Sequence, residues 1–254
     1  MQDDGTVLLA HVSDLHLDGG PRAAARAERV LGFLDRLVRP VDALLLTGDL
    51  ADHGTEAEYD EVKALLGERH PVLTCPGNHD ARGPYRKVLL GEPSSTEPIN
   101  AVHDLPGVRI VMCDSSIPGR DDGYLSDETL DWLARVLADG RASTPVLVAF
   151  HHPPVVLHSP FIDAIRQHGA ERLAALLAGH PEVVAVLVGH AHTPAASTFA
   201  GRPLLVAPGV RSTLRLPWET EAPLDEHLPP ALAFHVLDAD HRLTTHYRLV
   251  AETS

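Results

Sequence analysis

The sequence has few cysteines, few aromatic residues and few basic residues, and each shortage excludes a class of protein. Only two cysteines, Cys75 and Cys113, occur in 254 residues, so neither a disulfide framework nor a thiolate zinc site is expected, and a reducing cytoplasm is the predicted location. Aromatic residues make up 4% of the chain, which leaves few surfaces for stacking single-stranded bases. The 35 acidic residues outnumber 21 lysines and arginines, and this balance argues against a nucleic-acid partner.

Long apolar runs are also absent. No stretch approaches the roughly 18–20 residues that a membrane-spanning helix requires, and the acidic start Met1–Gly5 lacks the basic and apolar regions of a signal peptide. We therefore expect no membrane partner. The hydrophobic fraction of 44% is enough for a sizeable core, which excludes disorder as the main description.

Short apolar runs alternate with helical patterns, which is typical of an α/β fold. The predicted strands are Val7–Val12, Ala43–Leu46, Val72–Leu73, Val108–Met112, Val146–Phe150, Val183–Val188, Pro203–Ala207, Ala231–Leu237 and Leu243–Leu249. Helices are predicted over Arg22–Val38, after a capping box at Thr55 and Glu58, after the N-cap Ser126, and before Gly179. The Pro- and acid-rich segment Pro217–Pro230 is expected to be an exposed loop and not a linker, so residues 1–254 are predicted to form a single domain.

Histidine, in contrast, is abundant, and several of the 17 histidines directly follow predicted strands. The fragments at strand ends are Ser13–His16, Thr47–Gly54, Pro76–Asp80, His151–Pro154 and Gly189–His192. Because the carboxyl ends of strands in an α/β sheet share one edge, we expect these fragments to meet there.

The residue types in these fragments indicate a metal site. Asp14 and His16 are two residues apart, as are His190 and His192, and in extended backbone such pairs point the same way. Carboxylate, amide and imidazole ligands without thiolate suit Mn, Fe or Zn. There are enough ligands for two ions, and Asp49, in its glycine-flanked turn, is the natural carboxylate to bridge them. Two ions about 3.5–4 Å apart can hold a bridging hydroxide and stabilise an in-line displacement at phosphorus.

Each fragment has a structural alternative when it stands alone. Asn78 could be a turn residue, His151 and His152 could end a strand before a proline turn, and Asp52 could cap the helix near Thr55. The agreement of all the fragments at strand ends favours the shared metal site.

Together the fragments resemble the motifs of the calcineurin-like metallophosphoesterase superfamily, which are D-x-H, G-D-x-x-D, G-N-H-D, H-H before prolines and G-H-x-H. The resemblance runs in order from Asp14 to His192. It implies a two-sheet β-sandwich flanked by helices, in four αββα layers.

The resemblance also implies a role for each residue. It assigns Asp14, His16, Asp49 and His192 to one metal ion and Asp49, Asn78, His151 and His190 to the other. His151 is preferred to His152 as a ligand because the family uses the first histidine after the strand. His79 matches a catalytic histidine that gives a hydrogen bond or proton to the phosphate oxygens or the leaving group, and Asp52 matches the acid that orients it.

Within the superfamily, the chain is most similar to bacterial class III cyclic-nucleotide phosphodiesterases, through His11–His16, Phe150–Pro154 and Asp114–Gly123. This implies a dinuclear metal phosphodiesterase for small phosphodiesters such as 3′,5′-cyclic AMP, acting through a metal-bridging hydroxide with His79 assisting. In the last segment, Arg120–Asp122 stands where relatives often carry histidine.

Several alternatives remain within the same chemistry. The chain could be a glycerophosphodiesterase, a phosphomonoesterase or a nuclease, and the net charge of −14 argues against the nuclease. A non-catalytic metal scaffold would lack a ligand or His79, and all are present. The tail after Pro217 either closes over the site or builds a homodimer interface.

Overall fold

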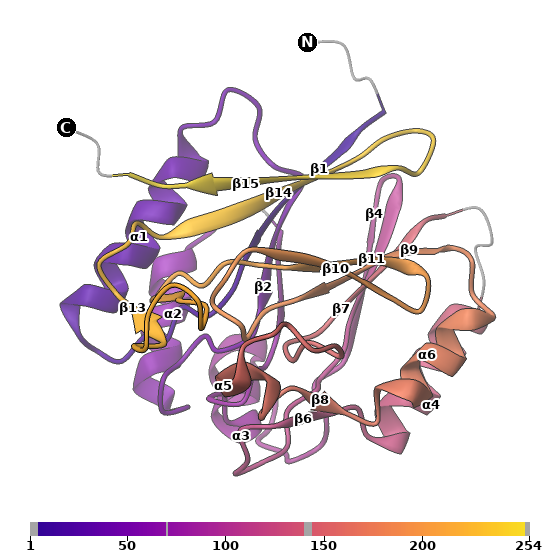
Figure 1. The fold of residues 1–254 in the computed structure, drawn as a ribbon, viewed down its shortest axis with the longest axis horizontal. Helices are drawn as coiled ribbons and strands as arrows, with labels where there is room; N and C mark the ends of the chain where they lie inside the picture. The colour runs from indigo at the N-terminus through magenta and orange to yellow at the C-terminus, as the bar shows by residue number, and fades with distance from the viewer. Residues whose placement is uncertain (1–4, 70, 140–143, 252–254) are drawn as a thin grey trace.

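Two β-sheets form the centre of the computed structural model, which describes residues 5–69, 71–139 and 144–251 (Figure 1). In order, the five strands of the first sheet are β15 (Leu243–Leu249), β14 (Ala231–Leu237), β1 (Val7–Val12), β2 (Ala43–Thr47) and β3 (Val72–Cys75). The six strands of the second sheet are β10 (Ala195–Phe199), β11 (Arg202–Val206), β9 (Val183–Val188), β7 (Val146–Ala149), β5 (Val108–Met112) and β4 (Ala101–Leu105).

The central strands are buried on both faces, which explains their nearly continuous apolar sequences. Leu9 and Leu45 pack between the two sheets, whereas Ala10, Leu44 and Leu46 pack against helices. This alternation follows from the two-residue period of a strand.

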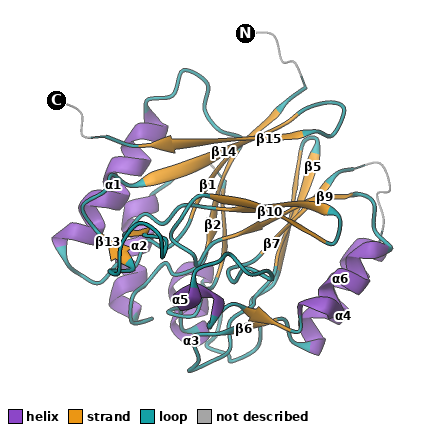
Figure 2. Ribbon diagram, viewed as in Figure 1, coloured by secondary structure: helices purple, strands orange, loops and turns teal. Residues whose placement is uncertain are grey.

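Helices cover the outer face of each sheet (Figure 2). The first sheet carries α1 (Pro21–Asp35) and α2 (Glu56–Leu66), and the second carries α4 (Asp127–Ala138) and α6 (Ala170–Ala178). Thr55 forms the predicted capping box of α2, and Ser126 caps α4. The four-layer αββα arrangement implied by the resemblance is therefore confirmed.

Sequence patterns missed the two edge strands of the second sheet and the short elements. β4 and β10 pair antiparallel at the two edges of the second sheet, and their partly exposed residues do not form an apolar run. The other unpredicted elements are α3 (Arg82–Tyr85), the π-helical turn η1 (Arg86–Leu90), α5 (Pro160–Asp163), β6 (Gly123–Tyr124), β8 (Gln167–His168), β12 (Thr213–Leu214) and β13 (Leu224–Asp225). The loop predicted over Pro217–Pro230 contains β13, which pairs with β12.

The parallel strands bring the predicted site to one end of the sandwich. β1, β2 and β3 run parallel in the first sheet, and β7 and β9 run parallel in the second. Among the described helices, none combines the length and the apolar character that a bilayer crossing requires. The acidic start at residues 1–4 lies outside the described residues.

Candidate metal centre

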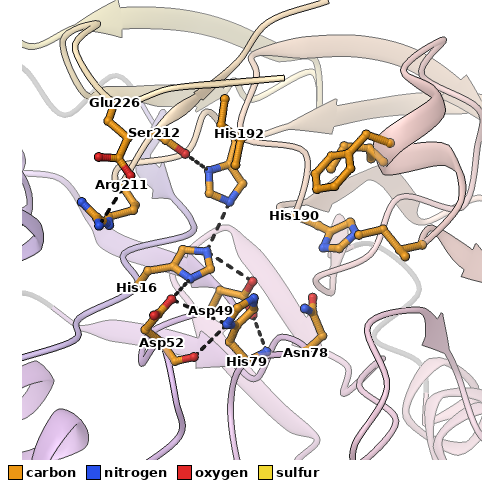
Figure 3. Close-up of a pocket in the computed structure, with 14 residues that line it drawn as sticks. His16, Asp49, Asp52, Asn78, His79, His190, His192, Arg211, Ser212 and Glu226 are labelled. Carbon is orange, nitrogen blue, oxygen red and sulfur yellow. Dashed lines mark hydrogen bonds and ion pairs between the residues drawn. The ribbon is translucent and has the colours of Figure 1, made fainter. Parts of the chain in front are cut away.

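The fragments after β1, β2, β3 and β9 line one pocket, so both sheets contribute to it (Figure 3). The fragment after β7 joins them through His151, which contacts Asn78 and Asp49. The pocket has a volume of about 260 Å³, which suits a small ligand. The predicted site residues that line it are His16, Asp49, Asp52, Asn78, His79, His190 and His192. The remaining two, Asp14 and His151, are fully buried and group with Asp49.

Asp49 lies between two groups of side chains. Its Oδ1 accepts a hydrogen bond of 2.9 Å from the backbone N–H of His79. Its Oδ2 is 3.5 Å from Nε2 of His16 and 3.3 Å from Nε2 of His151. One oxygen is thus held by the backbone, and the other faces both groups, as a bridging carboxylate requires.

The first group contains Asp14, His16 and His192. Nε2 of His192 lies 3.2 Å from Nε2 of His16 and 3.5 Å from Oδ1 of Asp14. Both carboxylate oxygens of Asp14 are buried without a hydrogen-bond partner among the described residues. Since an unpaired buried carboxylate is costly, this arrangement fits a cation.

The second group contains Asn78, His151 and His190. Nε2 of His151 lies 3.1 Å from Oδ1 of Asn78 and 3.2 Å from Nδ1 of His190. Nε2 of His190 is buried and has no partner in the described structure. His152 is close to both rings, but its Nδ1 faces the hydroxyl of Ser115 at 2.8 Å and its Nε2 faces the carbonyl of Asp121 at 3.2 Å. This geometry favours His151 over His152 as the ligand.

Hydrogen bonds hold the opposite ring nitrogen of three candidate ligands. The Nδ1 atoms of His16, His192 and His151 lie 2.8, 2.8 and 2.6 Å from the Asp52 carboxylate, the Ser212 hydroxyl and the Thr47 carbonyl, respectively. Such partners fix ring orientation and direct Nε2 to a metal.

Asp52 contacts two histidines of the site. Its carboxylate is 2.8 Å from the ring of His16 and 3.6 Å from Nδ1 of His79. Nδ1 of His79 instead donates to the backbone carbonyl of Asp52 at 2.8 Å. Asp52 therefore holds both histidines, but the carboxylate serves mainly the metal-ligand candidate.

Two candidate ligands, His190 and Asp49, are in the protonation state that a cation requires. A metal ion would have to displace a proton from His151, because burial alone would lower the pKa of this ring but the neighbouring carboxylates, Asp49 first, raise the pKa to about 9. Burial, followed by the neighbouring rings of His152 and His151, holds the pKa of His190 well below its usual range, so this ring is neutral near pH 7 and has a free lone pair. Burial alone would raise the pKa of Asp49, but the rings of His151 and His16 hold it well below its usual range. Metal ligands must be deprotonated, and these two groups meet that condition.

The backbone at the ligands is in the left-handed region. Asp14, His16, Asp49, His190 and His192 have φ values of 57°, 45°, 51°, 68° and 50°, where residues other than glycine rarely lie. The expectation of extended backbone at the two i, i+2 pairs is therefore wrong. Each strand instead turns sharply at its end, and His190 and His192 enter different groups.

Two glycines allow the loops to approach closely. A Cβ on Gly77 would lie 2.2 Å from Oδ1 of Asp49, and a Cβ on Gly48, whose φ is +88°, would lie 2.3 Å from Nδ1 of His151. Neither position has room for a side chain.

Sequence reasoning missed the structural role of Asp80. Its carboxylate accepts hydrogen bonds from the backbone N–H groups of Leu50, Ala51 and Gly77, at 3.2, 3.2 and 2.9 Å, and from the hydroxyl of Tyr59 at 3.0 Å. It therefore joins the two loops that carry Asp49 and Asn78. The sequence feature that could have pointed to this role is the position of Asp80 directly after His79.

Two other segments that the sequence singles out lie differently with respect to the pocket. None of residues 114–123, the segment similar to the cyclic-nucleotide group, lines the pocket, and Ser115 and Asp121 contact His152 instead. Leu224 and Glu226, from the tail, do line the pocket, which favours closure over the site as the role of this segment.

The chain is similar in sequence to several known proteins. The profile of the family described as calcineurin-like phosphoesterase matches residues 7–194. A probable cyclic nucleotide phosphodiesterase of Rhodococcus erythropolis is 39% identical, over 78% of this chain and 69% of that protein. A cAMP/cGMP dual specificity phosphodiesterase of Mycobacterium tuberculosis is 38% identical, over 79% of this chain and 66% of that protein.

Two further similarities extend over more of the chain. The glycerophosphodiester phosphodiesterase GpdQ of Enterobacter lignolyticus is 30% identical, over 90% of this chain and 86% of that protein. The crystal structure of a dimetal phosphatase from Danio rerio has a TM-score of 0.72 and 18% identity, with 97% of each chain covered. The second similarity concerns the fold alone.

Proposed function

The chain is a hydrolase that belongs to the calcineurin-like phosphoesterase family, and from this premise we propose that it hydrolyses small phosphodiesters, 3′,5′-cyclic AMP or a related cyclic nucleotide first among them. The observation that supports the proposal most strongly is the position of Asp49, with one oxygen facing both ligand groups. The relatives named as cyclic-nucleotide phosphodiesterases support the choice of a diester.

The donor set fits two transition-metal ions such as Mn, Fe or Zn. One ion would be held by Asp14, His16, Asp49 and His192, and the other by Asp49, Asn78, His151 and His190. When bound, the ions supply positive charge that lowers the pKa of water and neutralises phosphoryl oxygens.

His79 would act on the phosphoryl group without binding a metal. Its Nδ1 donates to the Asp52 carbonyl at 2.8 Å, so only Nε2 is free for a substrate. The ring lines the pocket and packs edge-on to His16, with 4.5 Å between the ring centres. Because Nδ1 is already a donor, Nε2 donates only when the ring carries both protons. The doubly protonated ring would give a hydrogen bond or a proton to a phosphoryl or leaving oxygen.

Turnover of a diester panel tests this proposal. The chain, supplied with Mn²⁺, is assayed on cyclic AMP, cyclic GMP, a glycerophosphodiester and phosphate monoesters. We expect diester hydrolysis that a chelator abolishes. His79→Ala should lower kcat by about 10²- to 10⁴-fold, the usual contribution of a general acid, while bound metal per chain stays unchanged. The exposed His246 gives a matched control, since His246→Ala should keep full activity.

Two results would contradict the proposal: no diester turnover by the metal-loaded chain, or full turnover by His79→Ala. Asn78→Ala, in contrast, should lower both turnover and bound metal, which separates a ligand from a proton donor.

A second candidate is a glycerophosphodiesterase. The relative named GpdQ aligns over 90% of this chain, a larger share than the cyclic-nucleotide relatives reach. A kcat/KM that is higher for glycerophosphodiesters than for cyclic nucleotides would favour this alternative.

A further inference from the structure

The pocket has an apolar wall beside the candidate metal ligands. Phe161 and Ile162 come from α5, Ile165 follows that helix, and Leu224 comes from β13. These residues line the same pocket as His79 and the predicted ligands. Neither metal binding nor proton transfer uses aliphatic or aromatic side chains, so the wall needs another explanation.

Phe161 and Leu224 are unusually open for large apolar residues. They are 50% and 43% exposed, and neither belongs to the three core clusters of the described structure. Ile162, next to Phe161, is only 2% exposed and packs into the core of the second sheet. The fold therefore anchors α5 through Ile162 and leaves the neighbouring ring uncovered at the pocket.

The polar residues of the pocket rim are already partly paired. Nη2 of Arg211 lies 3.5 Å from the carboxylate of Glu226 and 3.7 Å from that of Asp18. Figure 3 shows Arg211, Glu226 and Ser212 on the side of His16 and His192. Because the carboxylates offset the charge of Arg211, this rim does not add positive charge for a second phosphate. The uncovered apolar surface is the feature that remains for binding the organic part of a substrate.

We propose that Phe161 and Leu224 determine specificity by binding the flat base of a nucleotide diester while its phosphoryl group lies at the metal ligands and His79. This inference rests on the proposed function and narrows it. An aromatic ring offers a face on which any base can stack, and apolar surface gains nothing from the hydroxyl groups of glycerol. The wall thus favours a nucleobase over a glycerol group.

The test compares two diesters that differ only in the base. Cyclic AMP and ribose 3′,5′-cyclic phosphate share the same ring diester, but the second has no base. Phe161→Ala should raise the KM for cyclic AMP about tenfold with kcat unchanged, a loss within the usual range for one base–aromatic stack. The KM for the ribose compound should stay the same. Leu224→Ser should act in the same direction but more weakly, because it removes no ring.

Two controls make the result specific. Leu249, on β15, is 71% exposed and does not line the pocket, so Leu249→Ala should leave the KM for both diesters unchanged. Adenosine should inhibit the wild-type chain competitively and the Phe161→Ala variant about tenfold less. The inference is overturned if Phe161→Ala affects both diesters equally or affects neither. If the wild-type chain hydrolyses no diester, the proposed function itself is rejected. If the wild-type chain hydrolyses diesters but Phe161→Ala does not distinguish cyclic AMP from the ribose compound, only the role of the apolar wall is rejected.

Discussion

Replacing Asp80 with Asn should remove a specific dependence of stability on pH in the metal-free chain. The carboxyl group of Asp80 is buried, and burial, followed by the negative charge of Asp49, raises the pKa of Asp80 to about 6. The hydrogen bonds that its carboxylate accepts from three backbone N–H groups lower the pKa, but they do not cancel the increase. In the unfolded chain the pKa returns to about 3.9.

The sign and size of this pH dependence follow from the linkage between protonation of Asp80 and folding. Between these two pKa values the folded state binds the proton and the unfolded state does not, so the stabilisation is complete below about pH 4 and is lost as the pH rises through 6. The difference between a pKa of about 6 and one of about 3.9 corresponds to about 3 kcal/mol of unfolding free energy. An amide cannot titrate. The free energy of unfolding of the wild-type chain should therefore fall by about 3 kcal/mol relative to Asp80→Asn between pH 4 and pH 7.

Urea denaturation at several pH values, with chelator present, measures this difference. Asp60 is an exposed carboxyl group on α2, and Asp60→Asn should follow the wild-type curve at every pH. Parallel curves for wild type and Asp80→Asn would refute the reasoning. Bound metal ions should reduce this pH-dependent difference in unfolding free energy, because the cations offset the charge of Asp49, which helps to raise the pKa of Asp80.

The close approach at Gly77 and the burial of both thiols can also be tested. Gly77→Ala should abolish metal binding and lower Tm, because the new Cβ would lie 2.2 Å from Oδ1 of Asp49. The control Gly32→Ala, on α1, should keep full metal content. If metal analysis and a melting curve of Gly77→Ala both matched the wild type, this prediction would be contradicted. Cys75 and Cys113 are both buried, and burial followed by the charge of Asp114 raises the pKa of each thiol, so a disulfide reagent should label them only after unfolding; rapid labelling of the folded chain would disprove it.

Strands and helices of this fold were predictable where burial is complete. The apolar runs at Val7–Val12 and Val183–Val188 match β1 and β9, because strands covered on both faces need apolar residues at every position. β4 and β10 were missed because their polar, partly exposed residues form no apolar run. The apolar wall of the pocket was not predicted for a different reason. Phe161 and Leu224 lie in short elements, where a single apolar residue forms no periodic pattern.

The chemistry of the site was predictable from residue types, but its geometry was not. Cations select carboxylate, amide and imidazole donors, and these stand at strand ends where a sequence pattern can find them. The sharp turns that aim them depend on contacts between distant loops: the N–H groups of Asp14 and His16 donate to the carbonyls of Gly48 and Asp49 at 3.1 and 2.9 Å. A left-handed residue other than glycine costs about 1–3 kcal/mol and persists only where its surroundings impose it. Since those surroundings come from another strand, the i, i+2 spacing alone did not separate His190 from His192, and their assignment to different groups came from the resemblance to the family.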